Sequence, residues 1–288
     1  MLSIIGLVVL IVMVFGGFAI TGGSLGPVLH ALPHEFLIIG GAAAGATLVA
    51  TDIKGIKEMG GGLGKVVKGP KYKKADYGAA IFLTARLMRL FRTEGPTAVE
   101  PHIEDPKSSS IFAEYPQFAG DHFFISLVTD SIRLLVVSTG TLSPNAVDEV
   151  IETHIDTHHH AALKPVERLQ TMSDALPALG IVAAVLGVIK TMGSIDQPPA
   201  ILGAMVGSAL VGTFLGVLLS NGIVGPLSAR LKAVIDEDSE IYLVVRRVII
   251  ATLKGQPQPL VIEAARTAIS PTHQPSFSEI FDGMRTAK

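Results

Sequence analysis

The ionisable side chains of this sequence avoid its longest apolar runs. Two such runs form a hairpin around a break, and between Ala175 and Gly225 the only ionisable residues are Lys190 beside the break and Asp196 within it. The other two apolar runs are also uncharged inside. Ion pathways within a membrane normally use a buried Asp, Glu or His. If this chain conducts ions, we therefore expect a partner chain to supply the titrating group.

Carboxylates and histidines gather in two segments outside the runs. One turn carries Glu100, Glu104 and Asp105, but without the Asp/Asn/Gly spacing of a calcium loop. In IETHIDTHHH, His154 and His158 are four residues apart, as in helical zinc pairs, yet the HExxH arrangement is missing. We predict a solvated polar face here, with no metal ion and no other cofactor.

A glycine-rich stretch at Asp52–Pro70 contains GGGLGK, which superficially resembles a phosphate-binding loop. The Walker pattern needs Ser or Thr after the lysine, whereas Val66 follows here. We predict a flexible juxtamembrane connector whose lysines lie near anionic headgroups. No apolar run holds the Ser/His/Asp or paired-Asp constellation of an intramembrane enzyme, so we expect no catalytic residue.

Arginines recur every third position in a helix predicted over Tyr72–Thr93. Arg86, Arg89 and Arg92 share one helix face with few acidic partners in the same helix. The pattern is compatible with a solvated face or with a basic ridge that docks on an acidic protein surface, and composition does not choose between them.

The composition points to a membrane protein. Only 17% of the 288 residues are charged, whereas a soluble domain carries about 25%. The net charge of −2 argues against nucleic-acid binding, which needs a basic surface. The chain has no cysteine, which excludes disulfides and thiolate metal sites.

Four segments are candidates to cross a bilayer, which requires about 20 apolar residues. The first, Leu2–Ile20, lacks the basic n-region and cleavage site of a signal peptide. The second, Phe36–Ala50, reaches the required length if Pro33–Glu35 lie in the interface. The hairpin supplies the others, Ala175–Met192 and Ala200–Pro226.

The predicted fold is all-α, a polytopic membrane protein with four transmembrane helices and a large helical cytoplasmic region. We divide it into a pair of spans with a short exterior loop at 1–50, a cytoplasmic helical domain at 51–172, the span hairpin at 173–226 and a cytoplasmic helical tail at 227–288. Shorter helices are expected over Phe118–Thr139, from Ser143-Pro144 toward Arg168, over Leu227–Lys254 and up to Ile269, followed by a loose tail.

Basic residues set the expected orientation. Of the 23 Lys and Arg residues, 14 lie between Thr51 and Met172 and eight lie after Pro226. Basic residues concentrate on the cytoplasmic side of membrane proteins. We therefore expect a multi-pass membrane protein with both termini and the long middle segment in the cytoplasm.

The hairpin has features suited to close packing. In its second run, small residues recur every four positions, and such stripes let helices approach closely. They are Ala204, Ser208, Gly212, Gly216 and Ser220.

The two hairpin runs are antiparallel, so residues at equal distances from the break should lie at the same depth in the membrane. This places Ala184 and Thr213 together near mid-membrane, and Pro177 and Pro226 at the cytoplasmic end. These prolines are either helix start and stop signals or a pair of kinks.

Four stretches resemble the MotA family of flagellar stator proteins, within the MotA/TolQ/ExbB superfamily. They read VFGGFAITGGSLG, HIEDPKSSSIFAEYP, LPALGIVAAVLGVIKTMGS and VGTFLGVLLSNGIVGPL, in the family's order and over nearly the whole chain. The resemblance implies several copies, five in the family, around a single-span MotB-like partner whose aspartate carries the ion. Ion flow would then drive torque on the rotor protein FliG.

The resemblance also assigns residues. Pro177 and Pro226 match the family's two prolines, Thr213 its pore-facing threonine, and Arg92 and Glu100 its rotor-facing pair. Compared with the family's pattern, the region His158–His160 resembles a small insertion, to which we assign no role.

Sodium-driven relatives carry a further threonine where this chain has Ala184. A dehydrated sodium ion needs several oxygen ligands, whereas a proton needs only a carboxylate and water. The resemblance therefore favours proton coupling.

Two other functions compete with a stator. An ExbB/TolQ-type energiser of envelope transport typically has three spans, whereas four are predicted here, and Arg92 and Glu100 would lack a purpose. A non-conducting membrane scaffold would show no proton leak when co-expressed with its partner and would tolerate Pro177→Ala or Thr213→Val.

Overall fold

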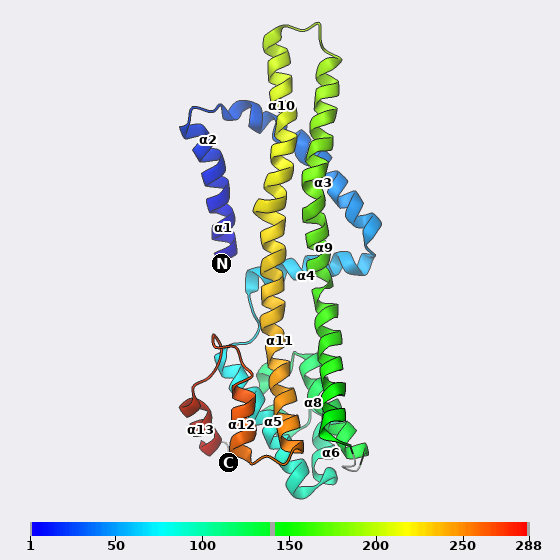
Figure 1. The fold of residues 1–288 in the computed structure, drawn as a ribbon, viewed down its shortest axis with the longest axis vertical. Helices are drawn as coiled ribbons and strands as arrows, with labels where there is room; N and C mark the ends of the chain where they lie inside the picture. Colours follow the sequence, from blue (N-terminus) through cyan, green and yellow to red (C-terminus); the bar gives the residue numbers. More distant parts are fainter. Residues whose placement is uncertain (1, 139–141, 287–288) are drawn as a thin grey trace. The chain divides into compact units, whose positions relative to one another are not determined.

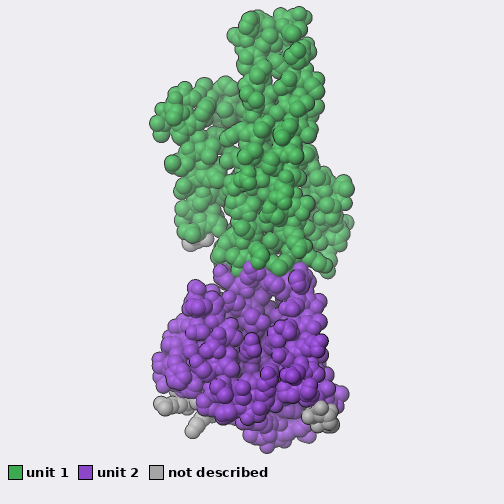
Figure 2. Space-filling view, viewed as in Figure 1, with its two compact units in different colours: residues 1–69, 162–234 green, residues 70–161, 235–288 purple. Residues whose placement is uncertain are grey.

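The computed structural model describes residues 2–138 and 142–286, and within those ranges it contains helices and no strand (Figure 1). The chain divides into two compact units (Figure 2). Unit 1 comprises residues 1–69 and 162–234, and unit 2 comprises residues 70–161 and 235–288. The all-α prediction is confirmed.

Unit 1 contains the apolar helices, including two π-helical segments named η1 and η3. Its elements are α1 (Leu2–Ile11), η1 (Val12–Gly16), α2 (Gly17–Ile20), α3 (Leu25–Ala50), α4 (Ile53–Lys68), the later part of α9 (Pro144–Met192), α10 (Pro199–Val217), η3 (Leu218–Val224) and the start of α11 (Gly225–Leu253).

Unit 2 combines shorter helices with the first part of α9 and the rest of α11. These shorter elements are α5 (Lys74–Glu94), α6 (Pro96–Glu104), α7 (Ser110–Ala113), the 3₁₀ turn η2 (Pro116–Phe118), α8 (His122–Val137), α12 (Gln258–Arg266) and α13 (Phe277–Thr286).

Four helical stretches in the described residues are long and apolar enough to cross a membrane, as predicted. They are Leu2–Ile20, Leu25–Ala50, Pro144–Met192 and Pro199–Leu253.

The second of these differs from its predicted bounds. Helix α3 begins at Leu25 rather than near Phe36 and runs through Pro33, so Glu35 lies inside the helix. A proline removes one backbone N–H donor, and the helix continues past that loss. The helix predicted to run from Ser143-Pro144 toward Arg168 is longer than expected. It is α9, which continues without interruption to Met192 and includes the third span.

The predicted flexible connector is wrong, because residues 53–68 form helix α4. The Asp52 side chain caps its start, accepting a hydrogen bond from the Gly55 amide at 2.8 Å. Two of its glycines permit close packing within unit 1. A Cβ at Gly62 would lie 2.7 Å from Leu231 Cδ2, and one at Gly55 would lie 2.5 Å from the Arg168 guanidinium carbon.

Unit 2 is organised around one apolar core formed by α5, α8, α9, α11 and α12. Its fully buried side chains include Tyr77 and Ile81 of α5 and Phe124 of α8. The predicted helices occur here with shifted ends, as with α8, which begins at His122 rather than Phe118.

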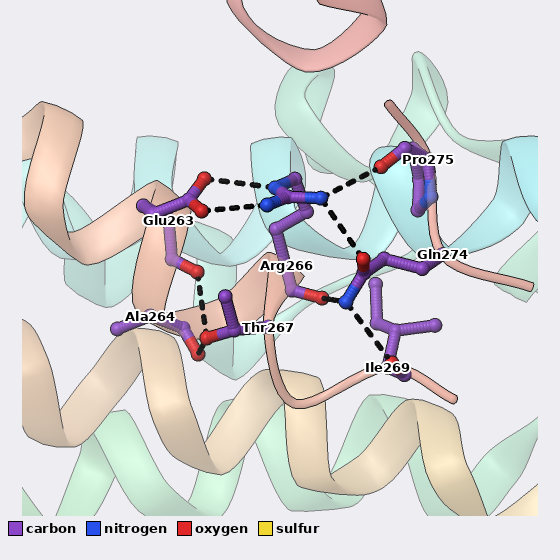
Figure 3. Close-up of polar contacts among 7 residues, drawn as sticks. All are labelled: Glu263, Ala264, Arg266, Thr267, Ile269, Gln274 and Pro275. Atoms are coloured by element: carbon purple, nitrogen blue, oxygen red, sulfur yellow. Dashed lines mark hydrogen bonds and ion pairs between the residues drawn. The ribbon is translucent and has the colours of Figure 1, made fainter. Parts of the chain in front are cut away.

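The predicted loose tail is also wrong. Beyond α12, Arg266 holds the chain by donating to Gln274 Oε1 at 3.1 Å and to the Pro275 carbonyl at 3.2 Å (Figure 3). The Gln274 amide donates in turn to the carbonyls of Arg266 and Ile269. This network leads into α13, whose Ile280 is buried in the core of unit 2.

Candidate functional site

The α9–α10 hairpin is closed by glycines that bring the two backbones together. A Cβ built on Gly180 of α9 would lie 2.8 Å from the Gly212 carbonyl oxygen and 3.1 Å from Gly216 Cα. One built on Gly187 would lie 2.6 Å from the Ala209 Cβ. Gly212, Gly216 and Ser220 of the predicted stripe are buried, whereas Ala204 is exposed. The buried part of this small-residue stripe of α10 therefore packs closely against α9 of the same chain.

Ala184 and Thr213 lie at the same level of the hairpin, as the depth match predicts. A Cβ at Gly212, the residue before Thr213, would lie 3.2 Å from the backbone nitrogen of Ala184. Both side chains are half-buried. A threonine hydroxyl and a methyl group therefore mark the same depth on two adjacent helices.

Pro177 and Pro226 do not lie opposite one another. The Ser173 hydroxyl donates to the Ser220 carbonyl at 3.1 Å, and the Ser228 hydroxyl donates to the Val166 carbonyl at 3.0 Å. These two bonds set the register of the pair. In this register, Pro226 lies beside a part of α9 that is about nine residues before Pro177. At a rise of 1.5 Å per residue, the two prolines differ in level by ~13 Å.

The two prolines lie in different helical surroundings. Pro177 lies inside the uninterrupted α9, whereas Pro226 is the second residue of α11, which begins directly after the π-helical segment η3 ends at Val224. The Gly225 amide donates to the Ser220 carbonyl across five residues, and that carbonyl also accepts from Ser173. Because π-turns and prolines loosen the regular ladder, this point is where α10 and α11 can bend relative to each other.

One functional candidate was missed from the sequence. Glu35 of α3 is only 6% exposed, and its Oε2 atom has no hydrogen-bond partner among the described residues. A Cβ at Gly212 would lie 2.7 Å from this oxygen. The expectation that all four spans are uncharged inside is therefore wrong, because α3 starts earlier than predicted. The missed signal was that VLHALPHEFLIIGG reads as one helix that includes Pro33 and Glu35.

Glu35 lines a cavity of about 360 Å³ between α3, α9 and α10. Its other lining residues include His34 of α3, Lys190 and Thr191 of α9, and Ser208 of α10. The cavity therefore extends from the level of Gly212 to the end of α9 that meets the hairpin break. A buried carboxylate without a partner is costly unless water or a mobile cation reaches it, and this cavity provides such access.

The two remaining predicted residues, Arg92 and Glu100, belong to unit 2. Arg92 is exposed in the last turn of α5, and its Nη1 atom donates to the Gln256 carbonyl at 3.4 Å. Glu100 is exposed on α6, which follows α5 after Gly95. Gly95 has a φ of 85°, a value that favours glycine. The turn places both side chains on consecutive helices with their charged groups at the surface.

The rest of the arginine ridge is only partly available. Arg86 is paired with Glu114 at 2.5 Å, whereas Arg89 is exposed. The pairing explains why a helix-face pattern alone overstates the free positive charge. Arg89 and Arg92 form the exposed part of the ridge.

The histidine segment forms part of α9 and packs within unit 2. The His158 ring stacks on Phe123 with centroids 3.6 Å apart, and His159 Nδ1 lies 2.9 Å from the Ser239 hydroxyl. Across residues 2–138 and 142–286, no group of three or more His, Cys, Asp or Glu side chains is arranged to hold a metal ion. The histidines thus contact neighbouring side chains in unit 2.

Polar contacts fasten α11 within unit 2. The Asp121 carboxylate accepts hydrogen bonds from the hydroxyls of Tyr72 and Tyr242 and lies 3.2 Å from Lys71 Nζ. Burial works to raise the pKa of Asp121, but the Tyr72 and Phe124 hydrogen bonds and the Lys71 charge outweigh it and hold the pKa below its usual value.

A second contact joins α11 to α9. Arg246 Nε donates to Asp148 at 2.5 Å and Nη1 donates to Glu152 at 2.7 Å. The Arg246 hydrogen bond lowers the pKa of Asp148 despite the opposing effect of burial.

Two family models match the chain, "Motility protein A N-terminal" over residues 4–95 and "MotA/TolQ/ExbB proton channel family" over residues 121–242. Motility protein A of Escherichia coli is 36% identical over 288 residues, covering 100% of this chain and 96% of the relative. The chain belongs to the motility protein A family of flagellar stator proton channels. Chemotaxis protein LafT of Vibrio parahaemolyticus is 35% identical over 280 residues, with 97% of each chain covered.

Solved structures share the fold of this motility protein A family member. The C. jejuni MotAB structure matches with a TM-score of 0.72 and 19% identity, covering 93% of this chain and 95% of that chain. The flagellar MotAB stator complex from Bacillus subtilis matches with a TM-score of 0.70 and 20% identity, covering 99% and 98%. The full-length match to motility proteins favours the stator over the envelope-transport alternative.

Proposed function

We propose that several copies of this chain, five by family resemblance, surround a MotB-like single-span partner in the inner membrane. The partner supplies the ion-carrying aspartate, and proton flow is converted into torque on the rotor protein FliG. Both termini and unit 2 lie in the cytoplasm, in keeping with the distribution of Lys and Arg.

The position of Glu35 against Gly212 carries this proposal. It brings a buried carboxylate to the residue next to Thr213, at the inner end of the cavity that leads to Lys190. Glu35 passes protons from the exterior side toward the Thr213 level, where the partner's aspartate takes them. Proton pathways in membranes rely on such buried acids.

Exposed apolar side chains support assembly with other chains. Ile181, Val185 and Ile189 of α9 and Phe214 of α10 are all exposed. Apolar surface on these inner spans suits contact with the partner's span and with further copies, where packing rather than water exclusion drives association.

Coupling to the rotor uses the hinge and the surface of unit 2. The η3–Pro226 segment lets α11 change its angle when the ion is bound, and α11 carries the Tyr242 and Arg246 contacts of unit 2. Arg92 and Glu100 then engage complementary charges on FliG. Proton rather than sodium coupling follows from Ala184, which provides no oxygen ligand beside Thr213.

The first test measures proton flux into cells that co-express the chain with its partner. We expect a protonophore-sensitive leak that Thr213→Val reduces, and swimming speed that does not depend on external sodium. Absence of any leak would favour a scaffold. Swimming that tracked sodium and ignored a protonophore would overturn proton coupling.

The second test separates rotor contact from conduction. Arg92→Glu or Glu100→Lys should impair motility while leaving assembly and proton flux intact. Matched controls are Arg247→Glu and Glu149→Lys, which reverse exposed charges elsewhere in unit 2. Normal swimming after both test reversals would contradict the assigned rotor contact.

A further inference from the structure

A second cavity in unit 1, of about 740 Å³, lies between α1, the end of α4 and the start of α11. Its apolar wall includes Leu2, Leu7 and Leu10 of α1 and Val67 of α4. Pockets that take ligands usually have volumes of roughly 300–1,000 Å³ and mostly apolar walls with a few placed polar groups. The size and lining suit an acyl chain.

Two basic side chains line this cavity. Lys68 in the last turn of α4 and Arg230 of α11 both line it, and none of its described lining residues is acidic. A Cβ at Gly69 would lie 4.0 Å from Arg230 Nη2, so the guanidinium sits beside the end of α4. These two cations are placed to hold a phosphate group.

Helix α4 sets the depth of the cavity. Gly55, Met59, Gly62 and Val66 form its buried face. A second face exposes apolar residues, namely Ile53, Ile56, Leu63 and Val67. A third carries lysines, namely Lys54, Lys57, Lys65 and Lys68.

Such a helix lies in the plane of the membrane interface, with its apolar face in the acyl boundary and its lysines at headgroup level. The cavity at its end is therefore at the depth of the headgroups.

We propose that this cavity binds an anionic phospholipid of the cytoplasmic leaflet. Its phosphate is held by Lys68 and Arg230, and an acyl chain lies along α1. The proposal rests on the membrane orientation given above. The cytoplasmic leaflet is the one that carries anionic lipids, so charge and location agree.

A second copy of the chain is the competing occupant. If a second copy filled the cavity with its own α1, it would bring no carboxylate, because α1 contains no acidic residue. The lipid supplies both the anion and the apolar chain in one molecule. Because Pro226 lines the same cavity, the bound lipid would contact the hinge between η3 and α11.

Lipid retention by the purified complex of the full chain with its partner tests the site. The complex is exchanged into detergent with phosphatidylglycerol or phosphatidylethanolamine, and retained lipid is counted by native mass spectrometry. We expect preferential retention of phosphatidylglycerol. The double variant Lys68→Ala/Arg230→Ala should lower its affinity about thirtyfold, since each of the two basic residues near anionic lipid contributes ~1 kcal/mol.

Two further variants keep the result specific. Lys54→Ala/Lys57→Ala removes the same charge from α4 outside the cavity and should retain the lipid. Gly6→Leu adds a side chain at a residue that lines the cavity, where nothing lies within 4 Å of a Cβ, and should expel the lipid. Equal retention of both lipids, or no loss in the Lys68/Arg230 variant, would overturn the proposal.

The second copy is tested directly. The chain has no cysteine, so Gly6→Cys provides a single thiol inside the cavity. Efficient cross-linking of this thiol to another copy would show that protein fills the cavity and would also overturn the proposal. Proton flux is measured separately, so a failed lipid site is distinguishable from a failed ion pathway.

Discussion

The Glu35 carboxylate of α3 rests against the backbone of Gly212 in α10, where a Cβ would lie 2.7 Å from Glu35 Oε2. The same Cβ would lie 3.2 Å from both the Ala183 Cβ and the Ala184 nitrogen. Three helices therefore meet at a residue that has no side chain. This meeting point is at the level of Thr213, so the packing of the hairpin and the position of the buried acid depend on each other.

Gly212→Ala should displace Glu35 and loosen the α9–α10 contact. The added methyl group meets backbone on one side, which moves little, and the carboxylate on the other. We expect proton flux and swimming speed to fall, with the protein still inserted in the membrane. Gly207→Ala is the matched control on the same helix, because nothing lies within 4 Å of its Cβ. Equal effects of the two substitutions would contradict a specific role for Gly212.

Glu35→Gln tests whether the carboxylate carries protons or only fills space. The amide has nearly the same shape as the carboxyl group, but it cannot take up and release a proton as a carboxylate does. We expect proton flux through the assembled complex to fall about tenfold, which corresponds to a barrier raised by ~1.4 kcal/mol. Glu35→Asp should keep part of the flux. Unchanged flux in Glu35→Gln, measured with a pH-sensitive dye, would remove Glu35 from the pathway.

The sequence was sufficient for features that depend on distance along the chain. Hydropathy located four spans, and counting residues along the two hairpin runs placed Ala184 level with Thr213. Features that depend on contacts between helices were not accessible. The offset of Pro177 from Pro226 follows from the Ser173–Ser220 hydrogen bond, which hydropathy does not encode.

Glu35 was missed for a related reason. The second apolar run was predicted to begin at Phe36, with Pro33–Glu35 in the interface, but α3 continues through Pro33 because packing against α10 and α9 stabilises the surrounding turns. Likewise, α4 forms despite its glycines because Gly62 and Gly55 let it pack closely on Leu231 and Arg168. In both cases tertiary packing outweighs local propensity.

Pro226→Ala should stiffen the junction between η3 and α11. Restoring the missing N–H allows a regular helical hydrogen bond, worth about 0.5–1.5 kcal/mol, and opposes the π-turn. We expect assembly to be retained and motility to fall more than proton flux. Pro199→Ala is the control, because proline at the first turn of α10 gives up no helical hydrogen bond. Loss of motility in both variants alike would argue against a hinge at Pro226.

The Asp121 network makes unit 2 sensitive to acid. The native pKa of Asp121 is below its unfolded value, so its contribution to stability is fully present above the unfolded pKa, near 3.9. That contribution is lost as the pH falls through the native pKa. Asp148, whose pKa is lowered by Arg246, acts in the same direction. We therefore expect the melting temperature of the purified complex to drop steeply below about pH 4.

Asp121→Asn isolates this contribution at neutral pH. The amide still accepts a hydrogen bond but loses the charge that faces Lys71 and strengthens the Tyr72 and Tyr242 contacts. Charge-assisted hydrogen bonds contribute about 1.5–3 kcal/mol, so thermal unfolding at pH 7 should shift to lower temperature and the acid-dependent part should shrink. Asp130→Asn, which removes an exposed carboxylate from α8, the helix that Asp121 caps, should change neither. An Asp121→Asn variant with the wild-type pH profile would show that the acid sensitivity of unit 2 arises elsewhere.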